Sequence, residues 1–316
     1  MRTIRIIAIV TAILVYALIV LGAVVRTTNS GLSCPDWPTC YGHWVPLPSD
    51  IAALPTVGYE YWQVMLEWVH RLIAGFFVGP LVLLLTVLTF LRRRAQPQLA
   101  LAGGALLVLL IVQGALGGLT VLDQNSPWSV AIHLGNALLV MTATLRIAAL
   151  ASPPDPSPRA LFGPALVVWC LGLFAMMSAA MTAKSGASLA CSTWPLCNGQ
   201  FVPDLGDEFI RIHFLHRVLA AATALALLYL YWRSRSVPNL PPSLARLVTL
   251  AAGLVVVQVG LGALIILLEV PIWKAVLHQA VGVLTFTLVT VILWRCAPMG
   301  SAPAFGEPDG LALRGA

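Results

Sequence analysis

Four histidines, arranged in the same order in the two halves of the chain, are the residues best suited to do chemistry. His133 lies 20 residues after the start of QGALGGLTVL, and His278 lies 20 residues after the start of the related segment QVGLGALIIL. Upstream of them, EWVHR contains His70 and HFLHR contains His216, 146 positions later. A polar side chain inside an apolar segment is costly and therefore usually functional. The duplicated histidine pair predicts a cofactor site in each half.

Two histidines in each half favour a haem over other metal sites. Imidazole binds several transition metals, but a zinc site needs three or four converging ligands. Only two histidines of each half recur at matching positions within its long apolar segments. Haem iron takes axial ligands on opposite faces of the ring, and two helices of a bundle can supply them. The pattern therefore predicts one bis-histidine haem in each half.

The residues three positions before the first histidine of each pair differ between the halves. Glu67 precedes His70, and His213 precedes His216. Side chains three residues apart lie on one face of a helix. A carboxylate in one half and an imidazole in the other predict one haem that reacts and one that carries electrons. Alternatively, Glu67 is an interfacial carboxylate paired with Arg71.

An arginine directly follows the first histidine of each pair. Arg71 and Arg217 could bind haem propionates through charge-assisted hydrogen bonds. They could equally extend to the membrane interface while their stems cover apolar surface. The sequence leaves both interpretations open.

A cysteine pair in each half forms a third repeated motif. CPDWPTC holds Cys34 and Cys40, and CSTWPLC holds Cys191 and Cys197, 157 positions later. Five intervening residues can close a small disulfide loop. Such a pair is either structural or redox-active, exchanging electrons or thiols with a partner. The C-x2-C spacing typical of zinc ribbons is absent from these segments.

The elements that must position these residues are membrane helices. Hydrophobic residues make up 59% of the 316 residues and charged residues 9%, against about 25% charged in globular domains. A bilayer crossing takes about 20 apolar residues. Eight segments reach that length, at roughly 4–25, 68–91, 99–121, 129–150, 161–183, 212–232, 247–268 and 273–294. The first is too long for a signal peptide, and no A-x-A cleavage site follows it, so we expect it to be retained.

The distribution of Lys and Arg predicts the orientation. Twelve of the 18 basic residues fall on one side of the predicted helices, and most acidic residues fall on the other. The positive side is cytoplasmic, which puts both termini inside and both cysteine loops outside. The four histidines then share one layer near the outer surface. The net charge of +6 reflects this topology and gives no reason to expect nucleic acid binding.

These observations predict an all-α membrane protein with eight transmembrane helices, arranged as two four-helix bundles that are parallel repeats. We expect an N-terminal bundle over residues 1–150 and a C-terminal bundle over 161–296. A Pro-rich linker, residues 151–160, would join them, and residues 297–316 would form a C-terminal tail.

The motifs EWVHR, QGALGGLTV, HFLHR and LHQA, on a duplicated eight-helix plan, resemble the heme A synthase family over residues 5–295. The outer C-x5-C loops are similar to those of bacterial members that carry a cysteine pair in each half. The resemblance implies an oxidoreductase of the bacterial cell (inner) membrane. Its reaction would convert the C8 methyl group of haem O to a formyl group by two hydroxylations, giving haem A for terminal oxidases.

The resemblance also implies roles for individual residues. His70 and His133 would hold the substrate haem, and His216 and His278 would ligate a haem b cofactor. Glu67 would be the catalytic carboxylate, and Cys34 with Cys40 the functionally relevant pair. Besides membrane lipid and the substrate haem O, heme O synthase would be a partner, because the substrate is hydrophobic and reactive.

Three other classes of protein fit parts of the pattern. A bis-histidine membrane cytochrome b would carry electrons only, but Glu67 in one half alone argues against it. A disulfide-generating membrane oxidoreductase would use the cysteine loops and leave the four histidines without a role. A transporter with parallel repeats would need more charged residues in its spans than this chain has.

Overall fold

The computed structural model describes residues 1–52, 58–153, 158–269 and 272–298. Eight helical segments in these ranges are long and apolar enough to cross a membrane, which confirms the expected multi-pass, all-α membrane protein. The main helices are α1 (Arg2–Thr27), α3 (Tyr61–Leu72), α4 (Gly79–Phe90), α5 (Pro97–Leu122), α6 (Pro127–Leu150), α7 (Phe162–Lys184), α8 (Glu208–Ser234), α9 (Pro242–Leu267) and α10 (Ile272–Cys296). The short elements are α2 (Pro48–Ala52), the π-helix η1 (Ile73–Val78) and the 3-10 turns η2 (Arg159–Leu161) and η3 (Ala187–Leu189).

The second span begins at Tyr61, well before the apolar run that predicted it. Its added turns mix apolar residues with Gln63 and Glu67, and these two residues contact the first cysteine loop. Gln63 accepts a hydrogen bond from the Glu60 amide at 3.0 Å and donates one to the Thr28 carbonyl at 2.9 Å. Ser33 in turn donates to the Gln63 carbonyl at 3.0 Å. Hydropathy does not detect a helix start that depends on such contacts.

The same span changes its winding just after His70. The α3 helix passes through η1 into α4 without a break. Pro80 lies in the first turn of α4 and supplies no amide donor, so the regular bonding of the preceding turn cannot be completed there. Single π turns of this kind occur frequently at functional sites.

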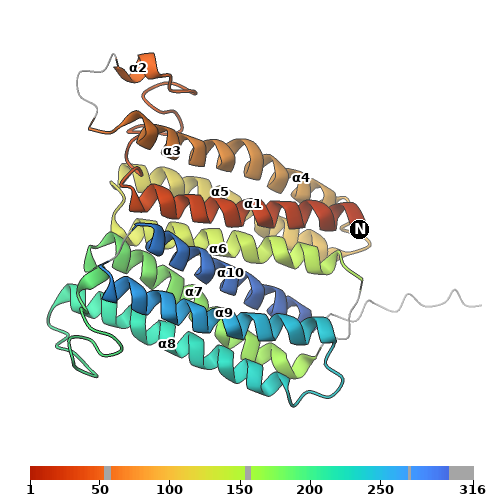
Figure 1. The fold of residues 1–316 in the computed structure, drawn as a ribbon. Coiled ribbons are helices and arrows are strands. Elements are labelled where there is room, and N and C mark those ends of the chain that lie inside the picture. Colours follow the sequence, from red (N-terminus) through yellow and green to blue (C-terminus); the bar gives the residue numbers. More distant parts are fainter. Residues whose placement is uncertain (53–57, 154–157, 270–271, 299–316) are drawn as a thin grey trace, which may run out of the picture.

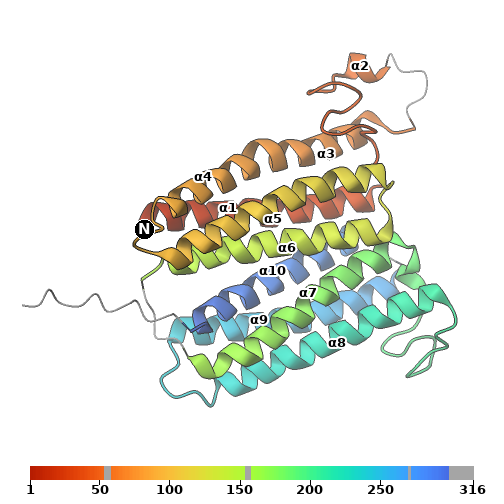
Figure 2. The ribbon, with the colours of Figure 1, turned by 180° about the vertical axis from the view of Figure 1, so that it is seen from behind.

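The helices of the two sequence halves lie on opposite sides of the molecule. In Figures 1 and 2, α1, α3, α4, α5 and α6 lie together, and α7 to α10 lie beside them. Each group has its own buried core, with Leu106 and Leu138 in the first and Leu227 and Leu244 in the second. The arrangement is consistent with the two expected bundles.

Helices α1 and α10 join the two groups. The Tyr16 hydroxyl of α1 donates to the Ala280 carbonyl of α10 at 3.2 Å. Phe286 of α10 belongs to the core of the first group. The boundaries 1–150, 151–160 and 161–296 stay a prediction. Within the proposed linker, residues 154–157 lie outside the described residues, as does most of the tail, residues 299–316.

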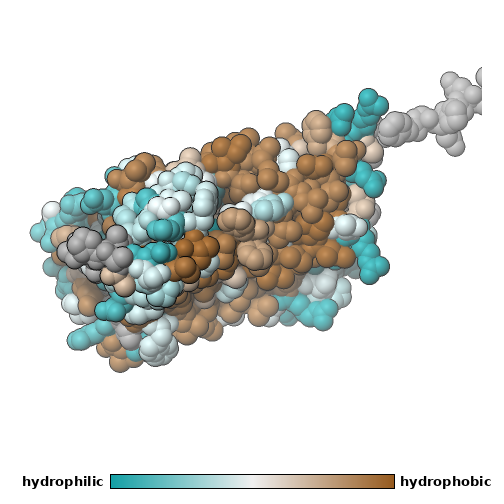
Figure 3. Space-filling model, turned by 90° about the horizontal axis from the view of Figure 1, so that it is seen from above, coloured by the Kyte–Doolittle hydropathy of each residue, from teal (hydrophilic) through white to brown (hydrophobic). Residues whose placement is uncertain are grey.

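The two ends of the helix array are chemically different. The N-terminus lies at the end opposite α2 (Figure 1), which follows the first cysteine loop. Brown apolar surface covers the middle of the molecule, with polar teal patches toward both ends (Figure 3). This pattern fits a bilayer around the middle of the array, with the cysteine loops in the water on one side.

Candidate functional site

The structure brings the histidines of each predicted pair together. His70 on α3 and His133 on α6 are close enough to interact electrostatically, as are His216 on α8 and His278 on α10. In each half, the two imidazoles therefore come from different helices, as two axial ligands of one haem would.

Glycines allow other helices to approach these rings closely. A methyl group at Gly22 of α1 would lie 3.3 Å from His70 Nε2. At Gly117 it would lie 3.5 Å from His133 Cε1, and at Gly262, which stands 145 residues later, 3.3 Å from His278 Cε1. The repeated small-residue segments of α5 and α9 thus pass directly against the second histidine of each pair.

A glutamine contacts the second histidine in each half. In the first half, Gln113 Nε2 lies 3.3 Å from His133 Nε2 and donates to the His133 carbonyl at 3.3 Å. The carbonyl oxygen of Gln113 accepts a 2.7 Å hydrogen bond from Asn136. Gln113 Nε2 also lies 3.4 Å from His133 Nδ1, so the amide packs against the imidazole while its hydrogen bonds to His133 and Asn136 fix its own position.

The second half has the same glutamine but a less complete network. Gln258 Nε2 lies 3.3 Å from His278 Nε2, while Val281 takes the place of Asn136 at the repeat offset. Gln258 Oε1 and His278 Nδ1 are buried, and neither has a hydrogen-bond partner within the described part of the chain. Across the site, Ser178 Oγ lies 3.1 Å from His216 Nδ1. Buried polar atoms without partners are rare and often mark a site for a bound group.

A cavity of about 580 Å³ lies between the two histidines of the second half. His216 and His278 line it, its walls include the apolar side chains Met176 and Phe286, and Trp194 of the second cysteine loop lines it as well. Its size and mixed lining are typical of small-molecule and cofactor sites. Two facing imidazoles, apolar walls and the unpartnered atoms of Gln258 and His278 fit a haem.

Both cysteine pairs form the expected disulfides. Cys34 bonds to Cys40 and Cys191 to Cys197. Each loop closes with an isolated antiparallel bridge, Cys40 to His43 in the first and Cys197 to Gln200 in the second. The two loops are thus alike in backbone as well as in sequence.

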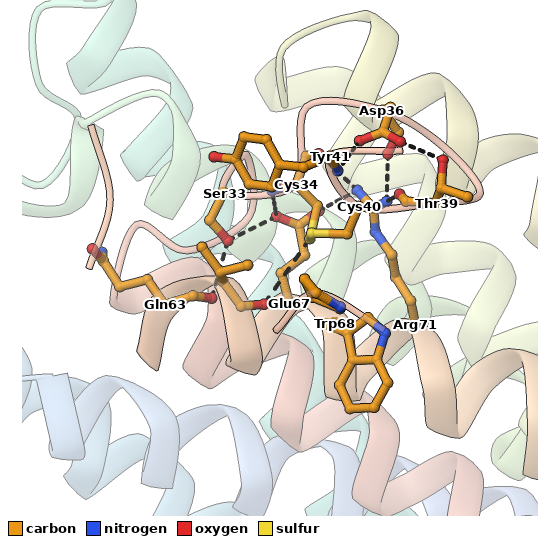
Figure 4. Close-up of a disulfide and its surroundings, with 12 residues drawn as sticks. Ser33, Cys34, Asp36, Thr39, Cys40, Tyr41, Gln63, Glu67, Trp68 and Arg71 are labelled. Carbon is orange, nitrogen blue, oxygen red and sulfur yellow. Dashed lines mark hydrogen bonds and ion pairs between the residues drawn. A yellow bond between two sulfur atoms is a disulfide. The ribbon is translucent and has the colours of Figure 1, made fainter. Parts of the chain in front are cut away.

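Arg71 and Glu67 hold the first loop against α3 (Figure 4). The Arg71 guanidinium donates to the carbonyls of Cys34 at 2.9 Å, Asp36 at 2.5 Å and Thr39 at 2.6 Å. It also pairs with Glu67 Oε1 at 2.5 Å. The other carboxylate oxygen of Glu67 accepts from the Cys34 amide at 2.9 Å and from Ser33 Oγ at 3.1 Å. Glu67 is only 5% exposed, so these are well-shielded contacts.

Arg217 and His213 hold the second loop in the same way. Arg217 donates to the carbonyls of Cys191 at 2.7 Å, Thr193 at 2.7 Å and Leu196 at 3.1 Å. His213 Nδ1 accepts from the Cys191 amide at 3.2 Å, and the other ring nitrogen, Nε2, lies 3.2 Å from Arg217 Nε. Each contact has its counterpart in the first loop.

The ion pair between Glu67 and Arg71 that the sequence offered as an alternative is therefore present. The ion pair is not the only contact of Glu67, because the same carboxylate also accepts a hydrogen bond from the Cys34 amide. Arg71 and Arg217 each bind three loop carbonyls, and Arg217 also lines the cavity. Their contact with propionates stays a prediction.

Asp36 organises the tip of the first loop. Its carboxylate accepts hydrogen bonds from the Tyr41 amide at 2.5 Å, the Gly42 amide at 2.9 Å and the Thr39 hydroxyl. Partial burial alone would raise the pKa of Asp36, but these hydrogen bonds outweigh it and hold the pKa below its ordinary value. In the second loop Thr193 takes this place and accepts from the Gly199 amide at 3.0 Å.

Sequence reasoning missed several polar residues of the site. Gln113 and Gln258 marked the repeat, but nothing assigned them to the histidines that they contact. The available signal was a polar residue inside an apolar span, at the same distance from a histidine in both halves. Arg26 and Gln279, which also line the cavity, gave no repeat signal.

Comparisons with known proteins place these features in a family context. The family model of the cytochrome oxidase assembly proteins matches residues 5–290. A heme A synthase from Shewanella oneidensis is 30% identical over 323 residues, covering 90% of this chain and 95% of its own. One from Methylobacterium radiotolerans is 30% identical, covering 96% and 94%. One from Shouchella clausii is 29% identical, covering 89% and 93%.

Proposed function

Because this chain belongs to the cytochrome oxidase assembly protein family and matches heme A synthases over most of its length, we propose that it oxidises the C8 methyl group of haem O to a formyl group. It is an oxidoreductase of haem A biosynthesis, and haem O is its substrate. The product supplies the terminal cytochrome oxidases.

The observation that carries this proposal is the cavity between His216 and His278. Two helices present imidazoles to one apolar space of about 580 Å³, and among the described residues His278 Nδ1 has no hydrogen-bond partner. In our proposal these two histidines hold haem b. Haem b supplies an iron that accepts and releases single electrons. The protein positions it through the histidines, with Ser178 against His216 and Gln258 against His278.

The first half would bind the substrate. His70 and His133 come from α3 and α6 and would hold haem O by its iron, with Gln113 fixing the His133 ring. Glu67 lies one helical turn before His70 and would act as the catalytic carboxylate. Its position in a shielded site strengthens any charge or proton interaction that it makes. Cys34 and Cys40 would be the disulfide that matters to the reaction, since Glu67 contacts the Cys34 amide directly.

The protein's setting is part of the proposal. We place it in the bacterial inner membrane with both termini in the cytoplasm, because the helix ends opposite the cysteine loops carry most of the Lys and Arg residues. The histidine pairs then lie near the outer surface. Heme O synthase would deliver the substrate within the membrane, because haem O is poorly soluble in water.

The test is to express the chain in a bacterium that makes haem O but has no heme A synthase, and to identify the porphyrins extracted from its membranes. We expect haem A in these cells, and only haem O and haem b in cells with the empty vector. A His70→Ala variant should remove haem A and leave haem b in the purified protein. Haem b without haem A from the wild-type chain would support the electron-carrier alternative and contradict our proposal.

A further inference from the structure

Arg26 reaches from the first helix group into the cavity of the second. It lies in the last turn of α1, and its Nη2 donates to Gln279 Oε1 on α10 at 2.8 Å. Gln279 Nε2 in turn donates to the Ile19 carbonyl of α1 at 3.4 Å. Gln279 directly follows His278, and both Arg26 and Gln279 line the cavity. A cation of the first half is thereby fixed next to a proposed haem ligand of the second.

This guanidinium has no anionic partner among the described residues. The ion pairs found there join Arg71 to Glu67 and His43 to Asp50. Apart from the bond to Gln279, no hydrogen bond from Arg26 is found in the same part of the chain. Its charged neighbour Lys184 is also a cation and not an anion. A half-buried cation at the edge of an apolar cavity is costly unless an anion accompanies it.

Arg217 is less suited than Arg26 to bind an anion in the cavity. All three of its guanidinium nitrogens already bond to the second loop or to His213. Arg26 uses only Nη2 for its bond to Gln279, which leaves Nε and Nη1 to donate to a ligand in the cavity. Two parallel N–H groups of a guanidinium match the two oxygens of a carboxylate. Haem is a flat apolar ring with carboxylate side groups, so its propionates are the anions that this cavity would receive.

We propose that Arg26 binds a propionate of the haem held by His216 and His278, so that the first half of the chain completes the haem site of the second. This inference rests on the proposed haem b site. Arg26 is then a positioning residue, and it also sets the electrostatic potential at the iron. Gly22 lies one turn earlier on α1, against His70. The last turns of α1 therefore contact His70 of the first pair and Gln279, the neighbour of His278, and fix one site relative to the other.

The experiment is a redox titration of haem b in the purified, intact protein. The visible spectrum reports the fraction of reduced haem, and the titration is repeated at several pH values. Arg26→Gln should lower the midpoint potential, because a nearby positive charge favours the reduced iron, which carries one positive charge less. The pH dependence of the potential should also move to higher pH, because a propionate without its cation holds its proton more tightly. Arg26→Lys should give a smaller change in the same direction, since an ammonium keeps the charge without the fork.

Lys184→Gln is the matched control. It removes another cation from the same end of the helices, but Lys184 does not line the cavity. We expect its haem b to keep the wild-type potential and pH dependence. If both Arg26→Gln and Lys184→Gln keep the wild-type potential and pH dependence, the proposed contact between Arg26 and a propionate is wrong. The proposed function would still stand in that case, provided that both variants contain haem b. Equal shifts in the two variants would also contradict the contact, because they would show a general effect of surface charge.

Two further outcomes are decisive. If Arg26→Gln does not accumulate in cells, the same titration of Arg26→Lys tests the contact instead. An unchanged potential and pH dependence in Arg26→Lys would then contradict it. If the wild-type protein contains no haem b at all, the proposed haem site fails first and the inference fails with it.

Discussion

Glu67 and His213 make the same two contacts in the two halves of the molecule. Each accepts a hydrogen bond from the main-chain amide of the first cysteine of its loop, and each contacts the arginine one turn later on its own helix. The duplicated framework is thus preserved, while the chemistry of this position differs. A carboxylate is charged and accepts hydrogen bonds at both oxygens, whereas a neutral imidazole in the same place carries no charge and accepts at one nitrogen only.

This relationship separates a catalytic role of Glu67 from a structural one. Glu67→Gln keeps the acceptor oxygen for Cys34 but removes the charge, so we expect the fold and haem b to remain. Haem A formation should fall by about 10²-fold or more, the usual contribution of a group that transfers a proton. Haem O or a hydroxylated intermediate should accumulate in the extracted porphyrins. His213→Gln disturbs the equivalent contact of the other loop and serves as the control. Similar losses in both variants would show that holding a loop is all that Glu67 does.

The two histidines of the cavity should be needed for haem b. His216→Ala or His278→Ala removes one of the two cavity imidazoles that, in our proposal, would hold the haem by its iron. We expect most of the low-spin haem b signal to be lost from purified protein, measured by its visible spectrum. His43→Ala, which changes a loop histidine outside the cavity, should retain the signal. A full low-spin spectrum in both cavity variants would refute the assignment of this site.

The cysteines report the orientation of the protein. After mild reduction of intact spheroplasts, a membrane-impermeant maleimide should label the four loop cysteines, Cys34, Cys40, Cys191 and Cys197. It should miss Cys170 and Cys296, which lie in α7 and at the end of α10. Mass spectrometry of the labelled peptides reads out each position. Labelling of the loops only after the membrane is broken would put them in the cytoplasm and contradict the argument from Lys and Arg.

The sequence predicted the spans, the histidine pairs and the disulfides because each leaves a local or repeated signal. Apolar length identifies a membrane helix, and the fixed spacing in two halves identified His70, His133, His216 and His278. The start of α3 at Tyr61 was not predicted. Its first turns are held by contacts with a loop about 30 residues away, and apolar length does not reveal such contacts.

The cross-bundle contacts could not be predicted in this way. Arg26 and Gln279 are 253 residues apart, and they meet only because α1 packs against α10. Neither has a repeat partner that would have attracted notice. The same holds for the loop carbonyls bound by Arg71 and Arg217, since a sequence pattern does not say where a main-chain oxygen points. Packing decides these interactions, so they appear only in the structure.

The first loop should loosen at acid pH as Asp36 is protonated. Because hydrogen bonds from Thr39, Tyr41 and Gly42 hold the pKa of Asp36 below its ordinary value of 3.8, the ionised carboxylate stabilises the folded loop. The sign follows from linkage: this stabilisation is present above the unfolded pKa and is lost as the pH falls through the lower, folded pKa. In the second loop Thr193, the counterpart of Asp36, does not titrate, but the imidazole of His213 beside the Cys191 amide does, so the second loop cannot serve as the pH-independent reference.

A phosphine reductant measures this effect when the wild-type protein is compared with Asp36→Asn at each pH. Asp36→Asn cannot ionise, so its Cys34–Cys40 disulfide should be reduced faster than the wild-type one already at neutral pH. As the pH falls from about 5 to about 3, the wild-type rate should approach the rate of Asp36→Asn, because protonation of Asp36 opens the first loop. Taking the ratio of the two rates for this one disulfide cancels the pH dependence of the reductant and of the other titrating groups that both proteins share. A ratio that does not change with pH would mean that the Arg71 contacts alone keep the loop closed, and that the Asp36 carboxylate adds nothing measurable to its stability.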